Sequence, residues 1–484
     1  MKRLLPFTLF VFISPLFAQQ RWEKTYYGGN YWLDRAFSVQ QTADGGYIIA
    51  GYTFPIVGGN DTTYVYLIKT DSFGDTIWTR IFCIRRGIYN IGYSVKQTAD
   101  GGYIIAGPTA RLYSSDIFLV KTDANGDTIW ARTYGGTDYE FGYSVQQTAD
   151  GGYIIAGYTN SFGAGSYDVY LIKTDTNGDT IWARTYGGTD YEFGYSVQQT
   201  ADGGYIIAGN SGPLHIYDVY LVKTDANGDT IWARTYGGTE DDEAFSVQQT
   251  FDGGYIIAGW TYSFSTGDSA DVYLIKTDSF GDTIWTRTYG GEETDVGYSV
   301  QQTADGGYII AGYTNSFGAG MRDVYLIKTD SLGDTLWTRT YGGATGDEGW
   351  SVQQTADGGY IIAGWKGNAQ NSPDVYLIKT DSLGLVYTGV EEQRTKPLPN
   401  LLLDVSPNPF TKTATIRYQL PSATPVRILA FDITGRTVAT LLDQNQPAGT
   451  HQLIWQPKGL AQGIYFIKLQ LPGSSFTQRC LYLQ

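Results

Sequence analysis

The sequence "TADGGYIIAGYT", residues 42–53, returns six more times along the chain with small changes. The aspartate of each copy lies at position 44, 100, 150, 202, 252, 305 or 357, so neighbouring copies are 50 to 56 residues apart. This spacing suits a unit of four short strands, and a chain of 484 residues is long enough for several such units and a second domain. The repetition therefore predicts an array of small antiparallel sheets.

One repeat divides into four predicted strands, at residues 143–148, 153–157, 168–174 and 180–186. Asp150-Gly151-Gly152 and "DTNGD" at 175–179 supply the tight turns between them. The second and third strands are apolar on both faces, which predicts sheets that pack against neighbours on both sides. A basic residue two positions after each tryptophan of the fourth strand is expected to pair with a carboxylate at the sheet edge.

The two ends of the array complement each other. Trp22 belongs to a fourth strand that precedes the first complete repeat, whereas the strand at 374–380 has no tryptophan-containing strand after it. Pairing these ends would complete the last sheet and hide its free edge. We therefore expect an all-β fold, a seven-bladed β-propeller closed by N-terminal strand pairing, over residues 19–388. An open solenoid is the alternative, and it would leave both partial ends unpaired.

The remaining segments differ in composition. Residues 1–18 read as a secretory signal peptide, with Lys2 and Arg3 ahead of an apolar run. Residues 389–400 are polar and predict a linker, and alternating apolar residues in 401–484 predict a small β-sandwich. No later run of 18 apolar residues exists, so no transmembrane segment is expected. Cys83 and Cys480 lie in different predicted domains, and we expect no structural disulfide.

The net charge of the chain and the variation among its loops indicate which kinds of partner it binds. The net charge of −15 disfavours nucleic acid as a partner. The loops between the second and third strands, and between one repeat and the next, vary among repeats, whereas the other loops are nearly uniform. Because binding concentrates on variable loops, the face that carries them is the predicted ligand face, for a glycan or a surface protein. Its candidate contact residues are Tyr31, Trp32, Tyr139, Tyr191, Trp260 and Trp365.

A carboxylate precedes the first strand of most repeats, four residues before its serine. The set is Asp34, Glu140, Glu192, Asp242, Asp295 and Asp347, with Asn90 in the remaining repeat. These positions predict an acidic ring at one mouth of a central channel, where oxygen ligands would suit Ca²⁺ or Mg²⁺. The alternative, which we favour, is that each acid caps its own turn. Apart from this possible Ca²⁺, no cofactor is expected.

Catalytic motifs are scarce. The chain has two histidines, His215 and His451, and no zinc spacing, nucleophile elbow or phosphate loop. We therefore expect no catalytic residues and a non-enzymatic binding or adhesion module. A secreted polysaccharide hydrolase that uses a carboxylate pair, and a purely structural surface protein, are the alternatives.

The C-terminal segment contains a set of motifs in a recognisable order. They are Pro407-Asn408-Pro409-Phe410, "DITG" ending at Gly435, "AGTH" with Gly449, Trp455, and Gly463-Ile464-Tyr465. This pattern resembles the type A C-terminal sorting domain of type IX secretion cargo. The resemblance implies a cell envelope of the Bacteroidota kind, contact with the type IX machinery, and location at the outer cell surface or in the medium, via the periplasm. It also implies removal of the domain and attachment to lipopolysaccharide, although Arg479 stands where many members carry lysine.

Overall fold

A computed structural model describes residues 21–27, 31–55, 62–85, 89–110, 113–214, 216–368, 373–386, 403–408, 410–420, 422–432, 436–471 and 474–483. The chain divides into two compact units, residues 1–387 and 388–484. All regular elements in the described residues are β-strands, which confirms the predicted all-β class of repeated sheets.

The strands of the first unit form antiparallel sheets, one for each repeat. The first four sheets contain β2 (Tyr31–Gln41), β3 (Tyr47–Pro55), β4 (Tyr64–Thr70) and β5 (Thr76–Phe82); β6 (Tyr89–Asn90), β7 (Ser94–Gln97), β8 (Tyr103–Ala110), β9 (Ser115–Thr122) and β10 (Thr128–Tyr134); β11 (Glu140–Gln147), β12 (Tyr153–Thr159), β13 (Asp168–Thr174) and β14 (Thr180–Tyr186); and β15 (Tyr191–Gln199), β16 (Tyr205–Gly212), β17 (Asp218–Thr224) and β18 (Thr230–Tyr236).

The other three sheets follow the same order. They contain β19 (Asp242–Gln249), β20 (Tyr255–Thr261), β21 (Asp271–Thr277) and β22 (Thr283–Tyr289); β23 (Asp295–Gln302), β24 (Tyr308–Thr314), β25 (Asp323–Thr329) and β26 (Thr335–Tyr341); and β27 (Asp347–Gln354), β28 (Tyr360–Lys366), β29 (Asp374–Thr380) and β1 (Trp22–Tyr26). In this last sheet the N-terminal strand β1 pairs antiparallel with β29, with Trp22 opposite Lys379 and Tyr26 opposite Val375.

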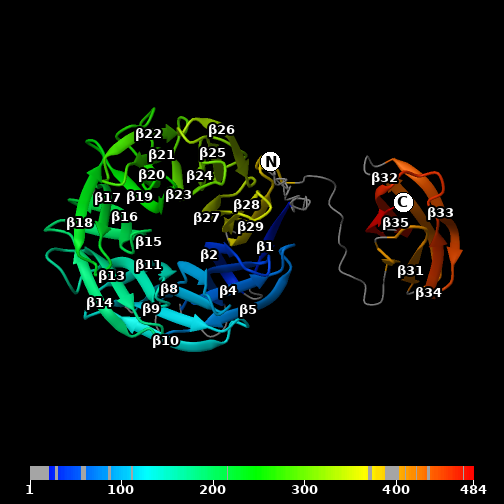
Figure 1. Ribbon diagram of the computed structural model, residues 1–484, viewed down its shortest axis with the longest axis horizontal. Helices are drawn as coiled ribbons and strands as arrows, with labels where there is room; N and C mark the ends of the chain where they lie inside the picture. Colours follow the sequence, from blue (N-terminus) through cyan, green and yellow to red (C-terminus); the bar gives the residue numbers. More distant parts are fainter. Residues whose placement is uncertain are drawn as a thin grey trace, which may run out of the picture. The chain divides into compact units, whose positions relative to one another are not determined.

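The sheets stand around a common centre, with the first strand of each repeat innermost and the tryptophan strand outermost (Figure 1). Buried apolar side chains fill the space between neighbouring sheets. One such cluster joins Ile104, Ile117 and Leu119 of one sheet to Tyr153 and Ile172 of the next. Each sheet is therefore packed on both faces, as the apolar second and third strands predicted.

The repeated Asp-Gly-Gly turn is held by a buried lysine. Gly151 has a φ of 84°, a conformation that glycine adopts without strain. Asp150 accepts hydrogen bonds from Gly152 N and Thr148 Oγ1, and Lys173 Nζ lies 2.8 Å from its Oδ2. Partial burial alone would raise the pKa of Asp150, but these bonds lower it to about 2. The same lysine–aspartate pair holds the turn in every repeat.

Ion pairs connect the outer edges of neighbouring sheets. Six basic residues that follow the tryptophans lie 2.5 to 4.0 Å from an aspartate of the next sheet, as predicted. The pairs are Lys24–Asp75, Arg80–Asp127, Arg132–Asp179, Arg184–Asp229, Arg234–Asp282 and Arg287–Asp334. The seventh basic residue, Arg339, has no such partner among the described residues, because residue 385 in the corresponding turn is leucine.

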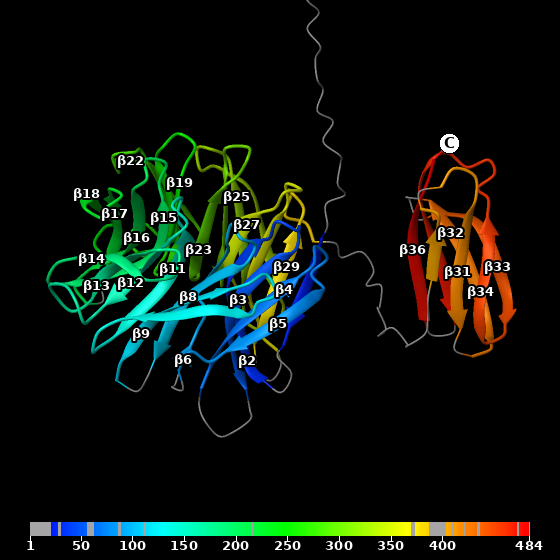
Figure 2. The ribbon, with the colours of Figure 1, turned by 60° about the horizontal axis from the view of Figure 1, so that its bottom comes forward.

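The second unit consists of two antiparallel sheets, whose strands run side by side in Figure 2. One contains β30 (Leu403–Ser406), β31 (Ala414–Leu420) and β34 (Gly449–Trp455). The other contains β32 (Thr424–Asp432), β33 (Thr437–Gln446), β35 (Gly463–Leu471) and β36 (Ser474–Tyr482). A single apolar cluster, which includes Ile416, Ile428 and Ile467, lies between them.

Two further features concern the whole chain. Among the described residues, no helix is long and apolar enough to cross a membrane. Cys83 is exposed and Cys480 is buried, and both are free thiols.

Loss of β1 is expected to destabilise the first unit strongly. A chain that starts at residue 28 lacks the strand that covers the edge of β29, together with the packing of Trp22 and Tyr26. Its melting temperature should fall by roughly 10 °C or more relative to a chain that starts at residue 21. Calorimetry on the two chains measures this difference, and equal melting temperatures would contradict the role of β1.

Candidate functional site

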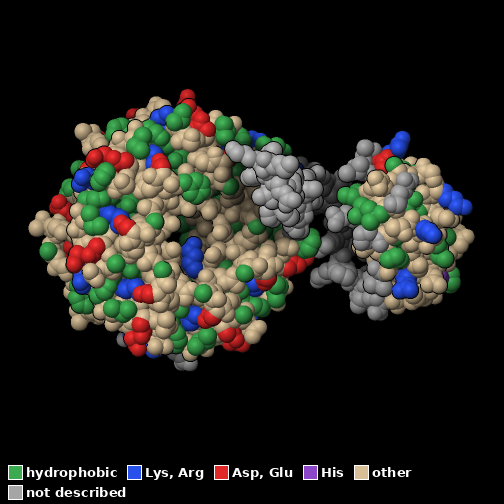
Figure 3. All heavy atoms as spheres, viewed as in Figure 1, with side chains coloured by type: hydrophobic (Ala, Val, Ile, Leu, Met, Phe, Trp, Pro, Cys, Tyr) green, Lys and Arg blue, Asp and Glu red, His purple; other side chains and the backbone are tan. Residues whose placement is uncertain are grey.

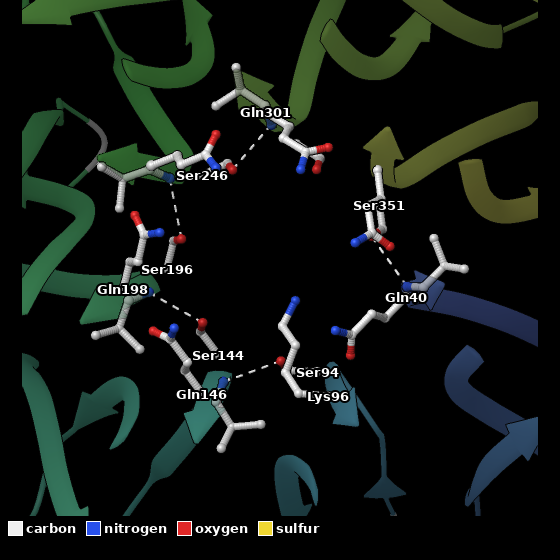
Figure 4. Close-up of a pocket in the computed structure, with 18 of the residues that line it drawn as sticks. Gln40, Ser94, Lys96, Ser144, Gln146, Ser196, Gln198, Ser246, Gln301 and Ser351 are labelled. Atoms are coloured by element: carbon white, nitrogen blue, oxygen red, sulfur yellow. Dashed lines mark hydrogen bonds between the residues drawn. The ribbon is translucent and has the colours of Figure 1, made fainter. Parts of the chain in front are cut away.

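The innermost strands are bonded to one another around the entire centre of the first unit. In each repeat the serine Oγ accepts a hydrogen bond from the backbone N–H of a valine in the next repeat, at 3.2 Å in every case. The series includes Val39 N bonded to Ser351 Oγ, so the first and last repeats are linked like the others (Figure 4).

A cavity of about 500 Å³ lies inside these strands. Its lining consists of the serine, valine and glutamine residues of the repeated "SVQQ" sequence, and it contains no aspartate or glutamate. Lys96 replaces glutamine in one repeat, and its side chain extends toward the middle of the opening (Figure 4). Figure 3 shows the hollow at the centre of the first unit.

Seven aromatic side chains form a second ring around the same axis. Each comes directly before the serine of an inner strand, and each is half-buried. Neighbouring ring centroids are 3.9 to 5.3 Å apart all the way round. The members of this aromatic ring are Phe37, Tyr93, Tyr143, Tyr195, Phe245, Tyr298 and Trp350. They lie toward the variable loops, since each inner strand begins at that face.

A β-bulge places six of the seven aromatic residues in the ring, and Tyr93 lies between β6 and β7. In the third repeat Gly142 pairs with Gly157 and Ser144 with Ala156, which leaves Tyr143 as the extra residue. Gly157 is required here, because a Cβ on it would lie 1.8 Å from the backbone oxygen of Phe141. Bulges commonly redirect a side chain in this way, and five other inner strands carry the same irregularity.

Charged groups border the aromatic ring on one side. Glu348 Oε2 accepts hydrogen bonds from Trp350 Nε1 at 2.9 Å and from Trp365 Nε1 at 3.1 Å. Its Oε1 pairs with Arg322. The guanidinium of Arg35 lies 4.5 Å from the ring centroid of Trp365, a cation–π contact. This charged rim, made of these five residues, combines flat aromatic surface with fixed hydrogen-bonding groups.

Glu243 is a second carboxylate near the aromatic ring. Burial and the charge of Asp241 raise the pKa of Glu243 to about 7, although a hydrogen bond with Asn210 opposes the shift. Its charge and that of Glu348 both act on Tyr298, whose pKa burial already raises well above the ordinary value. Glu243 therefore changes its protonation near neutral pH.

The predicted acidic ring is not a solvated feature of the channel mouth. All six carboxylates, Asp34, Glu140, Glu192, Asp242, Asp295 and Asp347, are at most 4% exposed. Glu140 accepts hydrogen bonds from Gly136 N at 2.8 Å and Thr159 Oγ1 at 2.8 Å, so it organises its own loop. Corresponding backbone bonds from the residue four positions earlier reach Glu192, Asp242, Asp295 and Asp347.

This geometry agrees with local capping and corrects the expectation of an open ring. Asn90 takes the same place with a neutral side chain, accepting from Thr109 Oγ1 and donating to Thr63 O. Burial raises the pKa of Asp347 to about 6. Among the described residues, no group of three or more histidine, cysteine, aspartate or glutamate side chains lies close enough to hold a metal ion.

The predicted ligand-face aromatics have different surroundings. Trp365 belongs to the charged rim, and Trp260 packs against Tyr262 at 5.3 Å. Tyr191 packs between Tyr167 and Phe193, and Tyr139 is half-buried beside the preceding repeat. The side chains of Tyr31 and Trp32, and all of His215, lie outside the described residues.

The sequence reasoning missed the aromatic ring and Lys96. Both carried a visible signal. The residue before each serine is always Phe, Tyr or Trp, and "YSVKQT" is the copy in which lysine replaces the first glutamine. Neither pattern shows by itself which side chains of the inner strand face the channel, because the bulge that shifts the alternation is not visible in the sequence.

The motifs of the second unit hold its last strand in place. Asn408 Oδ1 accepts a hydrogen bond from Leu481 N, and Phe410 bonds through its backbone to Leu481 and Leu483. The Phe410 ring packs 5.5 Å from Trp455, which in turn packs 5.7 Å from Tyr465.

The remaining motif residues have simpler positions. Gly449 begins β34 with a φ of 126°, Gly463 begins β35, and Pro407 is exposed just after β30. Pro409, Gly435 and the side chain of Arg479 lie outside the described residues. The motif residues that are described therefore join both ends of this unit.

Three solved structures illustrate what the chain is similar to. PorZ, an essential surface component of the type IX secretion system of Porphyromonas gingivalis, has 12% identity and a TM-score of 0.42, covering 94% of this chain and 60% of PorZ. Sqt1 from Chaetomium thermophilum has 11% identity and a TM-score of 0.42, covering 68% of this chain and 79% of Sqt1. An ulvan lyase of polysaccharide lyase family 25 has 9% identity and a TM-score of 0.45, covering 73% and 96%.

These likenesses are too distant to inform function, and the chain spans about 60% of the length of PorZ. No curated protein matches the sequence. The second unit gives a clear result, because residues 404–482 match the family model described as a secretion system C-terminal sorting domain. The chain therefore carries a type IX sorting domain at its C-terminus and is exported to the cell surface or secreted.

Proposed function

We propose that the first unit is a closed seven-bladed β-propeller that acts outside the cell as a non-enzymatic carbohydrate-binding module. Closure is supported by the β1–β29 pairing and by the bond from Val39 N to Ser351 Oγ. Binding is supported above all by the aromatic ring and its charged rim, which face the variable loops.

Carbohydrate is the ligand class that this surface suits best. Half-buried aromatic rings offer flat faces for stacking, and Trp350 and Trp365 are the largest of them. The partly exposed guanidinium groups of Arg35 and Arg322 supply charged donors that can fix the orientation of hydroxyl groups. The buried Glu348 holds Trp350, Trp365 and Arg322 in place. A concave apolar surface with a few fixed polar groups is the usual form of a small-ligand site.

Truncating Trp365 should weaken glycan binding by at least tenfold, since a buried aromatic anchor commonly contributes more than about 1.4 kcal/mol. A glycan array with the purified protein identifies a ligand, and titration calorimetry then compares the wild type with Trp365→Ala. Phe251→Ala is the matched control, because Phe251 is an exposed aromatic residue where the other six repeats carry alanine. Absence of any bound glycan, or equal affinity of Trp365→Ala and the wild type, would count against this proposal.

Polysaccharide hydrolysis is a second candidate function, and Glu243 is the observation that favours it. An acid with a pKa of about 7 can donate a proton near neutral pH, and Glu348 is a second carboxylate of the same face. Release of reducing ends from soluble polysaccharides tests this function. Activity that is lost in Glu243→Gln would support an enzyme, and absence of activity in the wild type would exclude this role for the substrates tested.

Glu243 should make stability depend on pH. Because its pKa is raised in the folded state, the folded protein binds this proton more tightly, and stability declines as pH rises toward 7. Relative to Glu243→Gln, the wild type should lose roughly 2 kcal/mol of unfolding free energy between pH 5 and pH 8. Denaturant titrations at the two pH values measure this. The exposed residue Glu240 provides the control Glu240→Gln, and a matching pH profile for both variants would contradict the assignment.

Export should depend on the second unit. Removal of residues 401–484 is expected to leave the first unit folded in the periplasm, because the sorting domain engages the secretion machinery. Immunoblots of periplasm, cell surface and medium from a host with a type IX system measure the distribution. Ile454→Ser, which changes an exposed side chain of the same unit, is the control. Equal secretion of the truncated and intact chains would refute the dependence.

A further inference from the structure

The first glutamine of the "SVQQ" sequence forms a tier of the channel below the serines. Its members are Gln40, Gln146, Gln198, Gln248, Gln301 and Gln353, with Lys96 in the remaining repeat. The Oε1 atom of each of these glutamines accepts a hydrogen bond from a backbone N–H of the next repeat, at 2.6 to 2.7 Å. A backbone N–H needs an acceptor, so this contact fixes which end of each carboxamide is the oxygen.

The amide nitrogens are consequently left for the channel. A carboxamide has one oxygen and one NH₂ group, and the six oxygens are already bonded to the backbone. Within the part of the chain that the structure describes, none of the six Nε2 atoms donates a hydrogen bond to another protein group. The tier therefore presents NH₂ donors to the cavity from six directions.

Lys96 adds a positive charge to these donors. It has no ion pair or hydrogen bond among the described residues, in contrast to the seven lysines of the third strands. As no carboxylate lines the cavity, nothing there neutralises the ammonium group. Burial lowers the pKa of Lys96, because the surrounding protein replaces part of the hydration of the charged form. An anion in the channel would compensate for that loss.

The substitution of lysine also removes a bond that the scaffold uses elsewhere. In the other repeats the glutamine oxygen bonds the backbone N–H of the following strand, but an ammonium group cannot accept. The N–H of Gln147 therefore receives no such acceptor from Lys96. The variant Lys96→Gln would restore the hydrogen bond that glutamine makes in the other repeats, so we expect it to keep the fold intact.

We propose that Lys96 and the six glutamine amides of this tier bind a small oxyanion in the channel. The site is separate from the aromatic ring, and its ligand chemistry is that of a compact group with several acceptor oxygens. Inorganic phosphate or sulfate, or the carboxylate of an acidic sugar, would fit this description. Charge-assisted hydrogen bonds from an ammonium group and several amide donors are the usual way in which proteins hold such groups.

Titration calorimetry on the full chain tests this site with three probes: phosphate, sulfate and glucuronate. Binding of any one probe supports the proposal if Lys96→Gln weakens it by at least tenfold, the loss expected for one charged hydrogen bond. The probe that binds distinguishes a free inorganic anion from an acidic sugar. In the wild type, affinity should also fall as pH rises through the pKa of Lys96, since the cation is the binding form.

A second variant makes the test independent of the lysine. Gln198→Glu keeps an oxygen for the backbone N–H of Gln249 and replaces the channel-facing NH₂ by a charged oxygen, so it should also abolish binding. Lys458→Gln and Gln452→Glu make the same charge changes at exposed sites of the second unit and should bind like the wild type. No binding of any probe at millimolar concentration, or unchanged affinity in Lys96→Gln and Gln198→Glu, would overturn the proposal.

Discussion

The hydrogen bonds between neighbouring inner strands are the interaction on which the first unit depends. The serine and the first glutamine of one repeat accept from the next repeat, and the second glutamine accepts from the turn of the repeat before it, as Gln97 Oε1 does from Ala43 N. Every inner strand is thus bonded on both sides. An unpaired buried donor destabilises the fold by about 1–3 kcal/mol. A single repeat, or an array that lacks one repeat, would contain several such unpaired donors and would be less stable.

These same strands produce the surfaces that can bind a ligand. The bulge turns one aromatic residue per repeat toward the axis, while the two following polar positions bond the scaffold together. The scaffold bonds use the serine and glutamine oxygens as acceptors, so Lys96 gives up one of these bonds. The aromatic position makes none of them and varies among Phe, Tyr and Trp.

The buried carboxylates illustrate how similar residues can serve opposite roles. Glu140 was one of six candidates for a cation site, yet it accepts hydrogen bonds from an N–H and a hydroxyl group of its own repeat. Such donors stabilise a buried carboxylate without a metal ion. Glu348 is equally buried, but its partners are two tryptophan N–H groups and an arginine at the edge of the aromatic ring.

The sequence by itself determined the all-β class, the strands of each repeat, the glycine turns and the sorting motifs of the second unit. These follow from local rules: alternation of side chains, positive φ at Gly151, and a fixed order of residues around Phe410 and Trp455. The lone strand at Trp22 also indicated its partner, because only β29 lacked a neighbour.

Only the tertiary structure decided which residues form the candidate sites. Whether Glu140 faces solvent or its own loop depends on how the preceding turn folds back, and spacing alone does not carry that information. The ring of Tyr143 and its counterparts exists because a bulge and an inward-facing strand recur around one axis. Lys96 looks like a minor change in the sequence, and it becomes a candidate anion-binding group because burial leaves it without a neutralising partner in a channel of amide donors.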